Sequence, residues 1–255
     1  MSVQLERDGA IARIVLSDPE RRNPLTVDFP DRILGLLDEL ERDASCRVII
    51  LTAQGPVFCA GADLGGVLHP DGVDPEQQYQ LVRGFNRVVR RMRELDLPII
   101  GALNGPSVGG GTALALACDF AIATPSAALM FAFGRVGGTS ADMGCTWLLS
   151  RLVGPARASQ LLLTGARLEA SDAAAIGIYC EVVDEESLAK RAQELAEQIV
   201  EASPRRATAA TKMALGLGAG IDLSTALDYE AFVQSWAFRT DEHQDRLRAF
   251  LATRK

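Results

Sequence analysis

The feature that most constrains the fold is a glycine-rich junction at 104–113, between an apolar run and a helix-like segment. The apolar run covers 99–103, and three consecutive glycines, Gly109 to Gly111, precede the apolar segment 114–118. Glycines at a strand-to-helix junction let a ligand approach the backbone closely, with amide N–H groups pointing at it. The positive end of the helix dipole suits such a junction to a developing oxyanion. The alternative is simply a helix packed tightly on a strand.

Two phosphate-binding motifs rely on the same physics, and both lack required residues here. A P-loop has Lys followed by Ser or Thr after its glycines, and no such pair follows Gly111. A dinucleotide fingerprint needs a third glycine at the position that Leu114 occupies. The stretch therefore indicates an oxyanion site rather than a phosphate site.

Composition and charge narrow the class of protein. A chain of 255 residues can bury a sizeable core as one large domain, and 48% hydrophobic with 23% charged residues is ordinary for a globular protein. The net charge of −7, without a compensating basic run, argues against nucleic acid as a partner.

Cysteine usage and the N-terminus bear on compartment and cofactors. The five cysteines are scattered, with no C-x-x-C pair and only two histidines, which argues against a zinc site or a disulfide framework. The first residues are charged rather than apolar, and no apolar run approaches the length of a membrane span. We therefore expect a cytoplasmic protein with no metal and no membrane partner.

Apolar runs alternate with helical patterns, which predicts an α/β core followed by a helical tail. Runs of strand length, the first two joined by a hairpin turn at Asp8-Gly9, are 3–7, 11–16, 48–52, 99–103, 120–123, 128–133 and 179–183. Helical patterns, the first capped by Thr26, are 26–43, 75–95, 146–152, 154–164, 170–175, 185–202, 205–217, 221–238 and 242–253. Glycines and prolines over 65–75 predict a loop.

Two loops follow neighbouring predicted strands, at 58–64 and 104–113. In a parallel sheet both loops emerge on the same side and can face one ligand. Two backbone N–H groups from separate loops form an oxyanion hole, which polarises a thioester or ester carbonyl.

These loops and the segments after them resemble the crotonase (enoyl-CoA hydratase/isomerase) superfamily. The matching segments are F-C-A-G-A-D-L at 58–64, N-G at 104–105, G-G-G at 109–111, C-D at 118–119, and the stretches 147–154, 163–165, 170–177 and 249–251. The resemblance implies an α/β fold, a spiral of β-β-α units over 1–200. It also implies that a C-terminal helical segment, 201–255, packs subunits into a homotrimer or a dimer of trimers and closes the active site.

The resemblance further implies an acyl-CoA substrate and no cofactor beyond the coenzyme A that the substrate carries. The oxyanion donors fall on the backbone N–H groups of Ala62 and Gly110, and CoA lies against 21–25 and 60–64. The residues thus assigned to substrate and CoA binding are Arg22, Asn23, Ala60, Ala62, Asp63, Leu64, Gly109 and Gly110.

The chain departs from the hydratases of this family at both of their catalytic carboxylates. One carboxylate stands three residues after the oxyanion glycine, where this chain has Ala113, and the other falls on or near Gly134. Addition of water to a double bond needs a general base for the water and an acid for the carbon. Hydration by the usual mechanism is therefore not expected.

One acid remains in the second glycine-rich loop, Asp142. Family members that shift double bonds carry an acid at the matching position, and such a shift needs only one group that removes a proton from one carbon and returns it to another. The competing interpretation makes Asp142 the N-cap of the next helix, and the two roles are compatible. We expect double-bond isomerisation with Asp142 as proton shuttle. The alternatives are a hydratase with non-standard acid and base groups, a thioester hydrolase, and a catalytically silent acyl-CoA binding protein.

Overall fold

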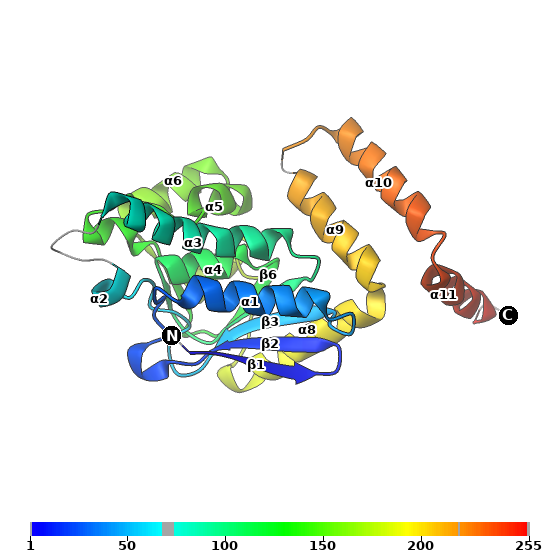
Figure 1. The fold of residues 1–255 in the computed structure, drawn as a ribbon, viewed down its shortest axis with the longest axis horizontal. Helices are drawn as coiled ribbons and strands as arrows, with labels where there is room; N and C mark the ends of the chain where they lie inside the picture. Colours follow the sequence, from blue (N-terminus) through cyan, green and yellow to red (C-terminus); the bar gives the residue numbers. More distant parts are fainter. Residues whose placement is uncertain (1, 68–73, 219, 254–255) are drawn as a thin grey trace.

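The computed structural model describes residues 2–67, 74–218 and 220–253, which form two β-sheets surrounded by helices (Figure 1). The larger sheet has the order β1-β2-β3-β4-β6-β9, with β1 antiparallel to β2 and the other neighbours parallel. Its strands are β1 (Val3–Asp8), β2 (Ile11–Leu16), β3 (Val48–Ala53), β4 (Ile99–Leu103), β6 (Phe120–Ala123) and β9 (Glu181–Val182).

A smaller sheet has the order β5-β7-β8. Its strands are β5 (Ser107–Val108), β7 (Ala128–Met130) and β8 (Arg167–Glu169). Neither β5 nor β8 is predicted from the sequence, because strands of two or three residues show no periodicity. The predicted strand 128–133 is too long: β7 ends at Met130, and a 3₁₀ turn over Ala132–Val136 follows. The predicted strand 179–183 is also too long, because β9 covers only Glu181–Val182.

Helices cover both faces of the larger sheet. They are α1 (Phe29–Arg42), α2 (Leu64–Val67), α3 (Pro75–Glu94), α4 (Gly110–Ala117), α5 (Cys145–Val153), α6 (Pro155–Thr164), α7 (Ala170–Ala175), α8 (Leu188–Ala202), α9 (Arg205–Gly218), α10 (Leu223–Ala237) and α11 (Asp241–Ala252). The predicted loop at 65–75 is partly wrong, because 64–67 is helical; 68–73 lies outside the described residues.

Alternation along β3 explains how both faces acquire a core. Ile49 and Leu51 belong to the larger cluster, which is shared with α1, α3 and α4. Val48 and Ile50 belong to the smaller cluster, which is shared with α8. Figure 1 shows α1, α3 and α4 stacked together over the sheet. Both faces of the central strands are therefore buried, as a parallel sheet requires.

The first helix starts later than predicted. Thr26 does not cap it: Asp28 occupies the N-cap, and the Thr26 hydroxyl donates instead to the Asp28 carboxylate at 2.5 Å. The reason lies just upstream, where the Leu25 N–H donates to Gly61 O at 2.7 Å. This bridge holds the chain extended at Leu25, so helical geometry begins only near Phe29.

The last helices depart from the α/β body. The expected core boundary at residue 200 falls inside α8, whose last residue is Ala202. Helix α9 packs against α3, whereas α10 and α11 extend away from the body and have no buried residue (Figure 1). Within the described ranges, no helix combines the length and apolar character needed to cross a membrane.

Candidate active site

Two loops meet at the carboxyl ends of β3 and β4. The strands are parallel neighbours, so the chain leaves both at the same edge of the sheet. Cys59 in the first loop then forms a parallel bridge with Ser107 in the second, and the Val108 N–H donates to Cys59 O at 2.9 Å. The convergence predicted from the sequence is confirmed.

Glycine permits the close approach of these loops. Gly61 has φ +83°, and a Cβ added there would lie 2.6 Å from Val108 O and 3.6 Å from the backbone nitrogen of Gly110. A Cβ added to Gly111 would lie 2.5 Å from Cys59 O. The segment around Ala62 therefore sits directly beside the first turn of α4 because these positions have no side chain.

The hydrogen bonds at this junction leave the N–H groups of Ala62 and Gly110 available. The Gly109 N–H donates to Met130 O and the Asp63 N–H donates to Leu25 O, each at 2.9 Å. Among the described residues, the N–H groups of Ala62 and Gly110 have no acceptor, and Gly110 is the first residue of α4, where helical N–H groups lack partners. Both donors named from the sequence are thus without an acceptor among the described residues.

Both donors line one cavity of about 430 Å³. Its wall is mostly apolar and comes from Leu25, the segment 60–67, helix α3, residues 108–110 and the stretch 130–143. Four lining side chains carry polar groups: Gln78, Arg135, Thr139 and Asp142. An apolar cavity with a few convergent polar groups is the usual form of a small-molecule site.

Asp142 supplies a carboxylate to the wall of this cavity. It is half-buried, and no other Asp or Glu among the described residues lines the wall. Its Oδ1 accepts the Met143 N–H at 2.6 Å. One acid and two unpaired N–H groups therefore face the same enclosed space.

The interpretation of Asp142 as a helix cap is wrong. The N-cap of α5 is Gly144, and no side chain caps this helix. Met143 at φ +50° and Gly144 at φ +77° are both left-handed, so the chain turns before the helix begins and Asp142 lies outside its first turn. A left-handed conformation is strained for Met, and such strain is concentrated at functional sites.

The two positions that hold carboxylates in hydratases face elsewhere. Ala113 is fully buried inside α4, and its N–H donates to Gly109 O at 3.1 Å. Gly134 is exposed at the surface. Neither residue is part of the cavity wall, so the acid–base pair expected of a hydratase is missing among the described residues.

The predicted CoA-binding segments form a short ribbon. The Ala60 N–H donates to Arg22 O at 2.9 Å, and the Leu25–Gly61 and Asp63–Leu25 bonds continue the pairing. The predicted residues that line the cavity are Ala60, Ala62, Leu64, Gly109 and Gly110, whereas Arg22, Asn23 and Asp63 do not.

Asn23 and Asp63 hold the ribbon in place. Asn23 is fully buried; its Nδ2 donates to Gln54 O at 2.9 Å and to Val57 O at 2.8 Å. Asp63 forms an ion pair with Arg21 at 2.5 Å. Both side chains are engaged inside the protein, so a contact of Asn23 with a ligand is left to its backbone.

Thr112 was not recognised from the sequence. This buried residue donates from Oγ1 to Ser107 O at 2.9 Å and lies 3.2 Å from Met130 O, the carbonyl that also accepts the Gly109 N–H. Thr112 thus fixes the first turn of α4, from which the Gly110 N–H projects. A threonine directly after three glycines was the available signal, since its side chain can bond backbone groups nearby.

Thiols near the cavity are unsuited to nucleophilic work. Burial raises the pKa of Cys59 to about 12, and burial followed by the charge of Asp142 raises the pKa of Cys145 to about 12. The thiolate is the nucleophile, so both groups are inert at neutral pH. Among the described residues, no three His, Cys, Asp or Glu side chains gather as they would around a metal ion.

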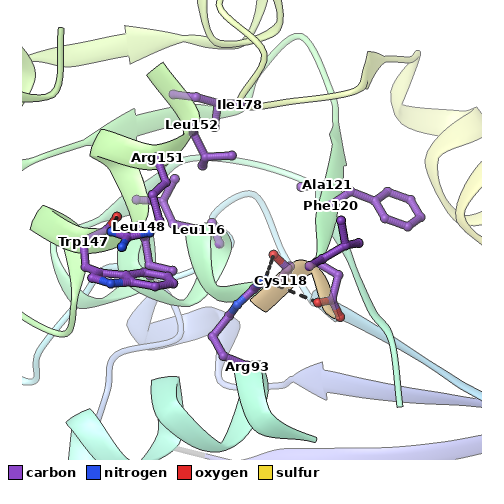
Figure 2. A pocket seen from close by; sticks show the side chains of 13 residues that line it. Arg93, Leu116, Cys118, Phe120, Ala121, Trp147, Leu148, Arg151, Leu152 and Ile178 are labelled. Atoms are coloured by element: carbon purple, nitrogen blue, oxygen red, sulfur yellow. Dashed lines mark hydrogen bonds and ion pairs between the residues drawn. The ribbon is translucent and has the colours of Figure 1, made fainter. Parts of the chain in front are cut away.

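A separate hollow of about 480 Å³, which does not contain Asp142, lies beyond the far end of α4 (Figure 2). Figure 2 shows Arg93 reaching toward Cys118 and Arg151 lying over the Trp147 ring. Arg93 forms an ion pair with Asp119 at 3.3 Å, and the Arg151 guanidinium lies 3.7 Å from the centroid of the Trp147 ring. Neither Ala62 nor Gly110 lines this hollow. It is not the place where the two free N–H groups can polarise a carbonyl.

Comparisons with known proteins agree with this site. The sequence profile of the family described as enoyl-CoA hydratase/isomerase matches residues 6–255. The chain is 37% identical to the 1,2-epoxyphenylacetyl-CoA isomerase of Escherichia coli over 248 residues, covering 97% of this chain and 94% of that protein. It is 34% identical to the short-chain-enoyl-CoA hydratase of Clostridium acetobutylicum over 256 residues, covering 100% and 96%.

Among solved structures, the enoyl-CoA hydratase of Bacillus anthracis superposes with a TM-score of 0.92 at 31% identity, covering 99% of this chain and 97% of that chain. The fold, the two loops and the full-length match agree. The chain therefore belongs to the enoyl-CoA hydratase/isomerase family, within the crotonase superfamily, and is an enzyme of that family.

Proposed function

We propose that this enzyme shifts a double bond within an unsaturated acyl-CoA. The observation that carries the proposal is the composition of the cavity: the free N–H groups of Ala62 and Gly110 share it with one described carboxylate, Asp142. A double-bond shift needs these groups and no second acid.

In the proposed reaction, the Asp142 carboxylate removes a proton from a saturated carbon that is next to the thioester carbonyl or linked to it through a double bond. The electron pair moves through the conjugated system to the thioester oxygen, forming an enolate. The N–H groups of Ala62 and Gly110 stabilise the developing negative charge, as an oxyanion hole does. The protonated Asp142 then returns the proton to another carbon of the same system, and the double bond reforms in its new position.

The CoA portion of the substrate is placed against the ribbon formed by 22–25 and 60–63. Backbone groups dominate this ribbon, and its ordering depends on the buried Asn23 and the Arg21–Asp63 pair. The names of similar proteins support an acyl-CoA substrate, since one is an isomerase and another a hydratase of CoA thioesters.

To test this proposal, the purified enzyme is incubated separately with 2-enoyl-CoA, 3-enoyl-CoA and dienoyl-CoA substrates, and absorbance and product mass are followed. We expect an isomer of unchanged mass with the wild-type enzyme, and loss of this product with Asp142→Asn. Asp172→Asn, which removes an exposed acid of α7, is the matched control and keeps the activity. Water addition that persists in Asp142→Asn would instead identify a hydratase with other acid and base groups.

We also propose that 201–255 packs subunits together as a trimer or a dimer of trimers. Its support is the exposure of large apolar side chains on α10 and α11, namely Leu223, Leu227, Phe232, Trp236, Leu247, Phe250 and Leu251. A cytoplasmic location is proposed as well, supported by five cysteines that are all free thiols.

A further inference from the structure

A second cavity, of about 650 Å³, lies on the other side of Asp142. Two residues, Asp142 and Met143, line both this cavity and the acyl cavity. The acid assigned to proton transfer is therefore part of a thin wall between two spaces.

Helix α3 runs past both spaces. Val82 and Phe85 line the acyl cavity, and one turn further along the helix Asn86 and Arg90 line the second one. Three polar residues that line the second cavity are exposed to solvent: Asn86, Arg90 and Thr146. The second cavity thus opens to solvent through polar groups.

The backbone between Asp142 and α5 keeps this wall thin. Met143 and Gly144 are left-handed, and a Cβ added to Gly144 would come within 3.6 Å of Val89 Cγ1. The turn therefore passes α3 closely and leaves only one layer of residues between the cavities. One oxygen of Asp142 accepts the Met143 N–H, and a carboxylate has about four acceptor positions, so others remain for water.

We propose that the second cavity is the route by which Asp142 exchanges its proton with solvent. Once Asp142 holds the proton taken from the substrate, a water molecule in this cavity removes that proton and delivers a solvent proton to the same carboxylate. One O–H bond breaks and one forms at each partner, so the step is balanced and needs no other reactant. Exchange then competes with return of the original proton to the substrate.

This inference rests on the proposed double-bond shift and predicts its isotopic outcome. With the wild-type enzyme in D₂O, product formed in a single turnover carries solvent deuterium at the newly protonated carbon. Asn86→Phe places a ring in the second cavity, so deuterium per product molecule falls severalfold while the double-bond shift continues. Arg87→Phe is the matched control, because Arg87 is the exposed neighbour on α3 and does not line the cavity; it behaves as the wild type.

A second variant, Thr146→Leu, closes the cavity from α5 and keeps the test decisive if Asn86→Phe fails to fold. Product without deuterium from the wild-type enzyme, or equal deuterium in the wild type and both cavity variants, would overturn the inference. Either result leaves the double-bond shift intact. Absence of any shift would instead remove the proposed function.

Discussion

At Gly110 the lack of a side chain serves the chemistry directly. A Cβ there would lie 2.6 Å from Leu25 Cδ1 and 2.9 Å from the Met143 sulfur, both parts of the cavity wall. These contacts are shorter than carbon atoms tolerate, so a side chain must displace either the donor or the wall. Packing therefore constrains this position to glycine, and the place of Gly110 at the start of α4 leaves its N–H free.

We predict that Gly110→Ala lowers kcat by about 10²–10³, the usual cost of losing one oxyanion donor. The control is Gly35→Ala on α1, where nothing lies within 4 Å and φ is not left-handed. That change should leave kcat unaltered and stabilise the helix by about 0.5–1 kcal/mol. Steady-state kinetics with both variants decides the matter, and a Gly110→Ala enzyme with normal kcat would contradict the assignment.

The buried thiols set how stability changes at alkaline pH. The pKa of Cys59, Cys118 and Cys145 is raised by burial from 9.0 to about 12. Between these values the unfolded chain loses protons that the folded chain keeps, so the free energy of unfolding falls as pH rises. At about pH 10 each of these thiols lowers the free energy of unfolding by roughly 1.4 kcal/mol relative to neutral pH. The pKa of Lys212 is lowered by burial and opposes the trend, because there the unfolded chain keeps its proton longer.

Urea unfolding at neutral pH and near pH 10 measures this loss. Replacing Cys145 by Ala should cost some stability at neutral pH but make the alkaline decline less steep, since one of the buried groups whose pKa is raised is gone. An unchanged pH slope in that variant would show that the thiols are not its cause. Modification with a thiol reagent is a further check: Cys180, the exposed cysteine, should react first.

Among the structural elements, those with a clear sequence pattern were predicted well, whereas contacts between residues far apart in the chain were not. The helix 75–95, the hairpin and the convergence of the two loops follow from short-range patterns, and the structure has α3, β1–β2 and the loop bridge where expected. The role of Asn23 was not predictable, since its partners Gln54 and Val57 lie about 30 residues away. The turn before α5 was missed for another reason: nothing in its sequence marks Met143 as left-handed.

The start of α3 offers a test at this scale. Asp74 caps the helix, and its carboxylate accepts the N–H groups of Glu76 and Gln77, both at 3.0 Å. We predict that Asp74→Ala lowers the free energy of unfolding by about 1 kcal/mol, whereas Asp74→Ser, another good N-cap, loses only part of it. Chemical denaturation of both variants measures the difference. Equal losses would mean that the charge rather than the cap matters.

In the whole molecule, a buried residue anchors α9 to the body, whereas α10 and α11 have no buried residue. Lys212 is buried, and its Nζ donates to Met92 O and Leu97 O and pairs with Asp119, each at 2.8 Å. A buried ammonium needs such partners. In contrast, Phe232 and Trp236 on α10 are 67% and 61% exposed. Large exposed apolar side chains on adjacent turns indicate an interaction surface.

We predict that Phe232→Glu together with Trp236→Glu converts the assembly to smaller species, as measured by light scattering coupled to size-exclusion chromatography. Gln234→Glu adds one negative charge to the same helix without removing an apolar group and is expected to leave the mass of the assembly unchanged. A wild-type protein that is monomeric at micromolar concentration would contradict the proposed packing role of 201–255.

In the proposed reaction one carboxylate, Asp142, moves the proton while the N–H groups of Ala62 and Gly110 hold the enolate. The most direct measurement compares turnover of a 3-enoyl-CoA by the wild-type enzyme and by Asp142→Asn, with binding of the CoA thioester measured in parallel. We predict that the variant still binds the thioester but shifts its double bond at least about 10²-fold more slowly, the lower range for loss of a general base. Isomerisation by Asp142→Asn at the wild-type rate would contradict it.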